Sequence, residues 1–192
     1  MLNDKAECVS VLIENGAALN NEYLLRVINV ISESQLKKII LSRPDNIPYF
    51  QEILDNHDKM IGFQLLGNTS KTRDNFCKTV TVARIVFEYF EKNSKPQDKM
   101  NEKEKRKAEE KMLKSVRSAF KKDAIFARDL AGNLLARIEN PLTKKFLSEN
   151  WSKIEKEFAK EIVKQEQKLI KEAEKAEKKT GNEEESKIVF KK

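Results

Sequence analysis

Residues 103–138 read KEKRKAEEKMLKSVRSAFKKDAIFARDLAGNLLARI, and this stretch decides the fold class. Its apolar residues recur every three or four positions, so an α-helix gathers them on one face. The first helix, 103–122, carries Met112, Leu113, Val116 and Phe120 on that face. A second helix follows through Leu130 and Leu134, and Asp123 before it is a residue type that caps helix starts. The pattern predicts two consecutive helices that bury their apolar faces.

The same spacing extends along the rest of the chain. Ser32 or Ser34 is expected to cap a helix, and Pro48 suits the first turn of the next one. The β-branched residues at 79–82 would also suit a strand, but the helical period fits the whole of 71–92 better. Five glycines and four prolines among 192 residues are too few for an all-β chain. The sequence therefore predicts an all-α fold.

The predicted helices divide into segments. Residues 1–92 are expected to form a helical domain, bundle-like or like a short solenoid, and residues 93–102 a linker. Residues 103–180 are expected to form a basic helical segment that resembles a coiled coil. Its last helix should be long, beginning at Thr143 and ending at Gly181. The tail, 181–192, is expected to be disordered because it is polar and terminal.

Charge is distributed unevenly along the chain, which carries a net charge of +7. Residues 1–92 hold 11 Lys/Arg against 12 Asp/Glu, whereas residues 93–192 hold 27 against 19. Such an asymmetry favours an anionic partner for the second half, such as nucleic acid, a membrane surface or an acidic protein. No signal peptide and no apolar run of about 20 residues is present. We therefore expect a cytoplasmic protein with no transmembrane segment.

Residues 6–20 read AECVSVLIENGAALN. Eight of them match, in register, the pattern E-V-V-x-L-L-L-E-x-G-A-D-x-N: Glu7, Val9, Leu12, Ile13, Glu14, Gly16, Ala17 and Asn20. This stretch resembles the second helix and following turn of an ankyrin repeat, although Ala18 replaces the usual Asp. A single repeat cannot bury its own faces, so the resemblance implies the end of a stack or a fragment of a longer ankyrin protein. It also implies a protein partner, bound through Leu12, Ile13 and Gly16.

The C-terminal tail carries a second, looser resemblance. Glu183, Glu184 and Glu185 are followed by Phe190, three residues from the end of the sequence. This arrangement resembles the export signal of bacterial type IV secretion effectors. The resemblance implies an effector that is translocated into a host cell.

Two helical surfaces are candidates for partner binding. Ile154, Phe158 and Ile162 belong to a nearly heptad-spaced apolar seam, which predicts either a coiled-coil partner, including a second copy, or packing against this chain's own helices. The second surface is a basic stripe at spacings of three, four or seven, which we define as Lys107, Lys114, Arg117 and Lys121. A cationic helix face can bind phosphates or an anionic membrane surface, or it can simply face water.

Signals for catalysis are weak. His57 is the only histidine, and Asp55 and Asp58 beside it come from one short stretch rather than from several converging elements. Residues 62–69 mimic a phosphate-binding loop, but Asn68 stands where the lysine is required. The sequence therefore predicts a non-enzymatic protein-interaction module with no catalytic, cofactor or metal residues. The alternative is a nucleic-acid-binding protein that uses the basic stripe on the helix at 103–122.

Overall fold

The computed structural model describes residues 11–12, 15, 31–55, 70–94 and 102–189. These residues form six α-helices and one 3₁₀ turn and include no strand, which confirms the all-α prediction. The elements are α3 (Glu33–Ser42), η1 (Pro44–Asn46), α4 (Ile47–Asp55), α6 (Ser70–Ser94), α7 (Glu102–Ala136), α8 (Pro141–Glu157) and α9 (Ala159–Val189).

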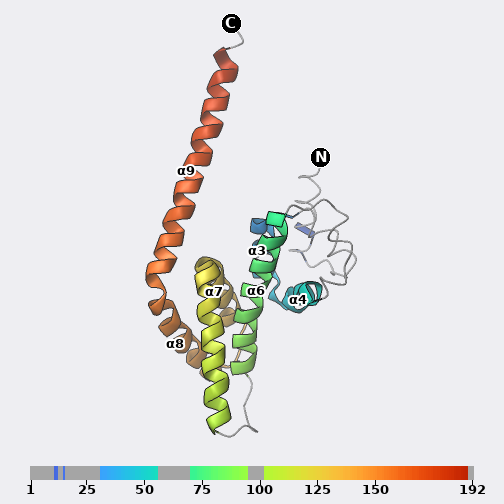
Figure 1. Cartoon of the computed structure of the whole chain (residues 1–192), viewed down its shortest axis with the longest axis vertical. Helices are drawn as coiled ribbons and strands as arrows, with labels where there is room; N and C mark the ends of the chain where they lie inside the picture. The colour runs from blue at the N-terminus through green and yellow to red at the C-terminus, as the bar shows by residue number, and fades with distance from the viewer. Residues whose placement is uncertain (1–10, 13–14, 16–30, 56–69, 95–101, 190–192) are drawn as a thin grey trace.

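The helices pack around the pair α6 and α7, which lie side by side (Figure 1). Helices α3 and α4 pack on α6, and α8 contacts both α6 and α7. Helix α9 begins against α7 and then extends away from the other helices (Figure 1). Residues 93, 94 and 102 of the predicted linker belong to α6 and α7, which pack together, and both helices contribute residues to one core. In the described part of the chain, no helix is both long and apolar enough to cross a bilayer.

Local signals explain where α3 and α4 begin. The backbone N–H of Gln35 donates to Ser32 Oγ at 3.2 Å, and the N–H of Ser32 donates to Gln35 Oε1 at 2.8 Å. This reciprocal capping box satisfies two backbone donors at the start of α3. Of the two predicted caps, Ser32 is the one that the structure uses. Pro48 lies in the first turn of α4, as predicted.

The centre of the core is aromatic. Phe120 is fully buried, and its ring centroid lies 5.4 Å from that of Trp151 and 5.2 Å from that of Phe158. The ring centroids of Tyr89 and Phe90 of α6 also lie 5.5 Å and 5.3 Å from that of Trp151. Such tilted and stacked ring pairs stabilise the fold beyond the area that they bury. The cluster therefore joins α6, α7 and α8 into one packed unit.

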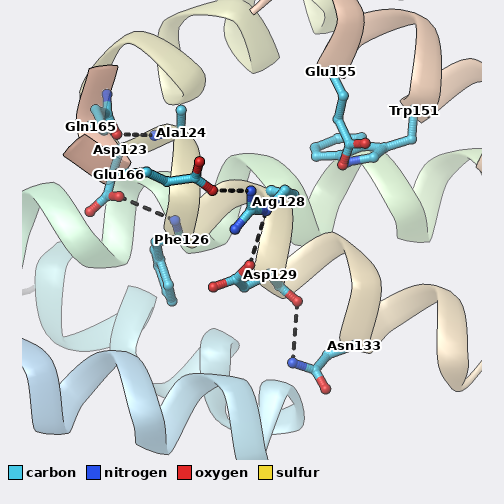
Figure 2. A network of polar contacts seen from close by, with 10 residues as sticks. All are labelled: Asp123, Ala124, Phe126, Arg128, Asp129, Asn133, Trp151, Glu155, Gln165 and Glu166. Carbon is cyan, nitrogen blue, oxygen red and sulfur yellow. Dashed lines mark hydrogen bonds and ion pairs between the residues drawn. The ribbon is translucent and has the colours of Figure 1, made fainter. Parts of the chain in front are cut away.

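Helix α7 is kinked at Asp123, whose φ of −159° and ψ of 86° are not helical. Its Oδ1 accepts the N–H of Phe126 at 3.2 Å, which confirms the predicted cap. The N–H of Ala124 donates to Gln165 Oε1 of α9 at 2.9 Å, so another helix satisfies a donor that the kink leaves without its helical acceptor (Figure 2). Asp123 Oδ2 also lies 2.6 Å from Lys37 Nζ of α3. The kink is thus held by side chains from three helices.

Lys37 is the cationic partner at this junction. Burial lowers its pKa, but hydrogen bonds to Asp123 and Glu33 outweigh burial, so the pKa is raised from the usual 10.5. The ammonium also lies 5.8 Å from the centroid of the Phe126 ring. Lys37 is therefore held in its charged form, facing a carboxylate and an aromatic ring.

The predicted long C-terminal helix is wrong in its boundaries. Helix α8 begins at Pro141, where Asn140 Oδ1 accepts the N–H groups of Leu142 and Thr143. It ends at Glu157, and its C-cap Phe158 has a non-helical φ of −104° and ψ of 10° and a ring that stacks on Phe120. Helix α9 then continues past Gly181 to Val189, because one glycine costs a helix only about 1 kcal/mol and helix formers surround it.

Candidate functional site

The predicted apolar seam is part of the core. Ile154 is 5% exposed and Ile162 is 8% exposed, and Phe158 is half-buried against Phe120. These three side chains therefore pack against this chain's own helices, which corrects their assignment to a partner-binding surface. Of the two alternatives for the seam, intramolecular packing applies to this part of it.

The apolar pattern continues along α9 after the neighbouring helices end. Val163, Leu169 and Ile170 are 49%, 55% and 58% exposed, although all three are large aliphatic residues. We call these three residues the α9 stripe. Val163 and Ile170 lie seven positions apart and hence on one helix face, whereas Leu169 lies about 100° around the helix, in line with Ile162. Val163 directly follows the buried Ile162, and Leu169 and Ile170 lie further along α9.

Acidic residues flank the α9 stripe. Glu166 and Glu174 lie one turn before and one turn after Ile170, on its face of the helix. The lysines Lys164, Lys168 and Lys171 lie at spacings of four and three on the opposite face, and all are exposed. Glu166 is paired with Arg128 of α7, so the negative charge beside the apolar face of α9 comes from Glu174.

The basic stripe lies on the first half of α7. Lys107, Lys114, Arg117 and Lys121 are all exposed, so they share the surface that the sequence predicts for them. Arg117 is nevertheless engaged by Glu157 of α8, with Nε 3.1 Å from Oε2 and Nη2 3.3 Å from Oε1. This pair reduces the positive potential near the end of the stripe.

Several predicted residues fall outside the described part of the chain. In the ankyrin-like segment, Leu12 is 60% exposed, whereas Ile13 and Gly16 lie outside the described residues. His57, residues 62–69 and the side chains at 183–190 also lie outside them. The resemblances at both ends of the chain thus stay predictions. Within the described ranges, no group of three His, Cys, Asp or Glu side chains is arranged to hold a metal ion.

A cleft lies between the second half of α7 and α8, with a volume of about 530 Å³. One wall comes from α7 and the other from α8; the lining residues are Arg128, Asp129, Gly132, Asn133, Leu135, Ser148, Trp151, Ser152 and Glu155. Sequence analysis missed this cleft because its walls are two helices whose relative placement no local pattern encodes. The cleft is open to solvent, and most of its lining residues are exposed.

Charged groups of the cleft are already partly paired (Figure 2). Arg128 Nη1 lies 2.7 Å from Glu166 Oε1 of α9, and its Nε lies 3.2 Å from Asp129 Oδ1. The bond to Glu166 is the main reason that the pKa of Arg128 is raised, against a smaller opposing effect of burial. On the α8 wall, Trp151 Nε1 donates to Glu155 Oε1 at 2.8 Å. The guanidinium is therefore neutralised internally, and the remaining charge in the cleft is negative.

Gly132 lies in the middle of the second half of α7, where glycine destabilises a helix. A Cβ atom placed on it meets no other atom within 4 Å, so no close packing requires a glycine here. We expect Gly132→Ala to raise the free energy of unfolding by about 0.5–1 kcal/mol, because alanine has the higher helix propensity. Urea denaturation followed by circular dichroism measures the change, and a loss of stability would contradict the open space found at this position.

The cleft offers hydroxyl, amide and carboxylate groups, a chemistry suited to hydrogen bonding and charge recognition. The one sequence signal that points to it is the isolated glycine within a helical pattern. Comparison of the chain with protein-family models, with curated proteins and with solved structures finds no match.

Proposed function

We propose that this chain is a non-enzymatic protein-interaction module that binds a basic amphipathic helix of a partner protein along the α9 stripe. The observation that carries the proposal is the exposure of Leu169 and Ile170, at 55% and 58%, on the helix that extends beyond the core. Val163 and Ile170 lie seven positions apart, which is a spacing of the apolar anchors in helix recognition. The ankyrin-like residues 6–20 fit the same class of function, since ankyrin surfaces bind proteins.

Charge supports a basic partner. Glu174 borders the stripe, whereas Glu166 is paired with Arg128, so a Lys or Arg beside the apolar face of a partner helix would meet the charge of Glu174. A second copy of α9 would place glutamates against glutamates. Exposed lysines on the opposite face keep that side in water. The favoured occupant is therefore a basic helix from another protein.

A photo-crosslinking experiment tests the proposal. p-Benzoylphenylalanine is placed at position 170, on the stripe, or at position 164, on the opposite face, in cells that naturally make the protein. We expect an adduct from position 170 alone, in which the crosslinked peptide is a basic amphipathic segment. Equal adducts at both positions, an acidic peptide or a second copy of this chain would each overturn the proposal.

Affinity for the purified partner measures the contribution of the stripe. Burying a leucine or isoleucine side chain is worth about 1.5–3 kcal/mol, and about 1.4 kcal/mol changes affinity tenfold. The double variant Leu169→Asp, Ile170→Asp is therefore expected to bind at least about a hundredfold more weakly. Both residues are exposed, so the fold should be unaffected. Calorimetric titration gives the affinities.

The basic stripe supplies the matched comparison. The alternative function, binding to nucleic acid, would use the exposed Lys107, Lys114 and Lys121 of α7. The variant Lys114→Glu, Lys121→Glu is expected to leave affinity for the partner within about twofold. If the lysine double variant abolishes binding and the α9 double variant does not, binding through the basic stripe is favoured over binding through the α9 stripe.

A further inference from the structure

We propose that the cleft between α7 and α8 binds a positively charged side chain, an arginine or a lysine, of a partner protein. The ligand's origin in a protein partner rests on the proposed function, whereas the cleft itself does not depend on the α9 stripe. The cleft and the stripe meet at the ion pair of Arg128 with Glu166.

The cleft is large enough for a long side chain. The cleft of about 530 Å³ can hold one long side chain and part of the backbone that carries it. Gly132 lies on its α7 wall, where a Cβ atom would have no neighbour within 4 Å. Ser148 and Ser152 on the facing helix are also small. Small residues on both walls keep the space open, at a cost in helix stability on the α7 side.

The residues that line the cleft supply hydrogen-bond acceptors. Asp129 uses Oδ1 for Arg128, and Glu155 uses Oε1 for the indole N–H of Trp151. In the described part of the chain, no hydrogen bond reaches Asp129 Oδ2 or Glu155 Oε2. Asp129 and Glu155 come from opposite walls of the cleft. The hydroxyls of Ser148 and Ser152 add further acceptors.

The charge of the lining residues favours a cationic ligand. Arg128 is the one cation that lines the cleft, and it already faces two carboxylates, Asp129 and Glu166. Glu155 has no cationic partner among the described residues. An anionic ligand would meet a neutralised guanidinium and a carboxylate with no cation beside it, whereas a guanidinium or ammonium would form charge-assisted hydrogen bonds. Trp151 is 2% exposed and contributes to this lining mainly through the bond from its indole N–H to Glu155.

Trp151 is the only tryptophan of the chain and lies in the cleft, so its fluorescence reports on occupancy. The full chain is titrated with acetyl-Ala-Arg-Ala-amide and, as a neutral isostere, with acetyl-Ala-citrulline-Ala-amide. We expect a saturable change of emission with the arginine peptide and an affinity at least about tenfold lower for the citrulline peptide. No saturable change, or equal affinities, would overturn the proposal.

Variants locate the binding to the cleft. Gly132→Leu fills the space and is expected to abolish the response, with circular dichroism as the check on folding. Glu155→Gln retains an acceptor for the indole but loses the charge, and should weaken binding about tenfold. An unchanged affinity in a folded Gly132→Leu variant would show that the peptide binds elsewhere and would overturn the assignment. The variant Leu169→Asp, Ile170→Asp should titrate normally, so failure of the stripe and failure of the cleft are distinguished.

Discussion

Replacing Phe120 with alanine is expected to lower the free energy of unfolding by about 3–5 kcal/mol, the usual cost of deleting a buried phenylalanine ring. Phe120 is fully buried, with Trp151 and Phe158 at centroid distances of 5.4 Å and 5.2 Å. Its loss leaves a cavity where α7, α8 and the start of α9 meet. Domains are stable by only about 5–15 kcal/mol, so this change removes a large fraction of the total. Guanidinium denaturation followed by the fluorescence of Trp151 measures it.

Phe146→Ala is the matched control, because the same atoms are deleted from a ring that is 54% exposed. We expect this variant to lose less than about 1 kcal/mol, since most of the Phe146 ring is in water in the folded state as well. Similar losses in the two variants would mean that Phe120 is not enclosed as the structure places it. The comparison thus tests burial rather than the chemistry of the side chain.

Asp123→Ala is expected to have the second largest effect, a loss of about 2–4 kcal/mol. The change removes the N-cap of the second half of α7, worth about 1 kcal/mol, and the carboxylate that faces Lys37 at 2.6 Å. The side chains are 11% and 26% exposed, so the pair is partly screened, and its loss costs less than that of a fully buried pair. Lys37 also retains Glu33 at 2.7 Å. Urea denaturation at neutral pH measures the loss.

A double-mutant cycle separates the two roles of Asp123. Asp123→Asn keeps an oxygen for the N–H of Phe126 but removes the charge, so it should cost less than Asp123→Ala. In a Lys37→Met background the asparagine change should cost still less, because the ammonium is absent. Equal costs in both backgrounds would mean that the ion pair adds nothing and that Asp123 acts as a cap alone.

Local sequence signals predicted the parts of the fold that depend on a few neighbouring residues. Asp123 was identifiable as a cap, and the cap of α3 was narrowed to Ser32 or Ser34, because a capping side chain binds backbone N–H groups only two or three residues away. The helix predicted at 71–92 matches α6, since its apolar period is long enough to outweigh its β-branched residues. The break at Phe158 had no such signal, because it accompanies a ring contact with Phe120, 38 positions earlier.

The candidate site was less predictable. The basic stripe is exposed as predicted, but the cleft depends on how far apart α7 and α8 lie along Gly132, Ser148 and Ser152. The seam residues Ile154, Phe158 and Ile162 had two possible partners, and periodicity alone could not distinguish a second molecule from the chain's own helices.

The sequence by itself determined that the chain is helical, where several of its helices begin, and which face of each is apolar. Only the tertiary structure decided which part of an apolar face is covered. The period of α9 runs on from Ile162 to Leu169 and Ile170, yet the first is 8% exposed and the others more than half. The physical reason is that periodicity is a property of one helix, whereas burial depends on how far its neighbours extend. The contacts of α7 with α9 at Gln165 and Glu166 are followed within one turn by the exposed Leu169 and Ile170.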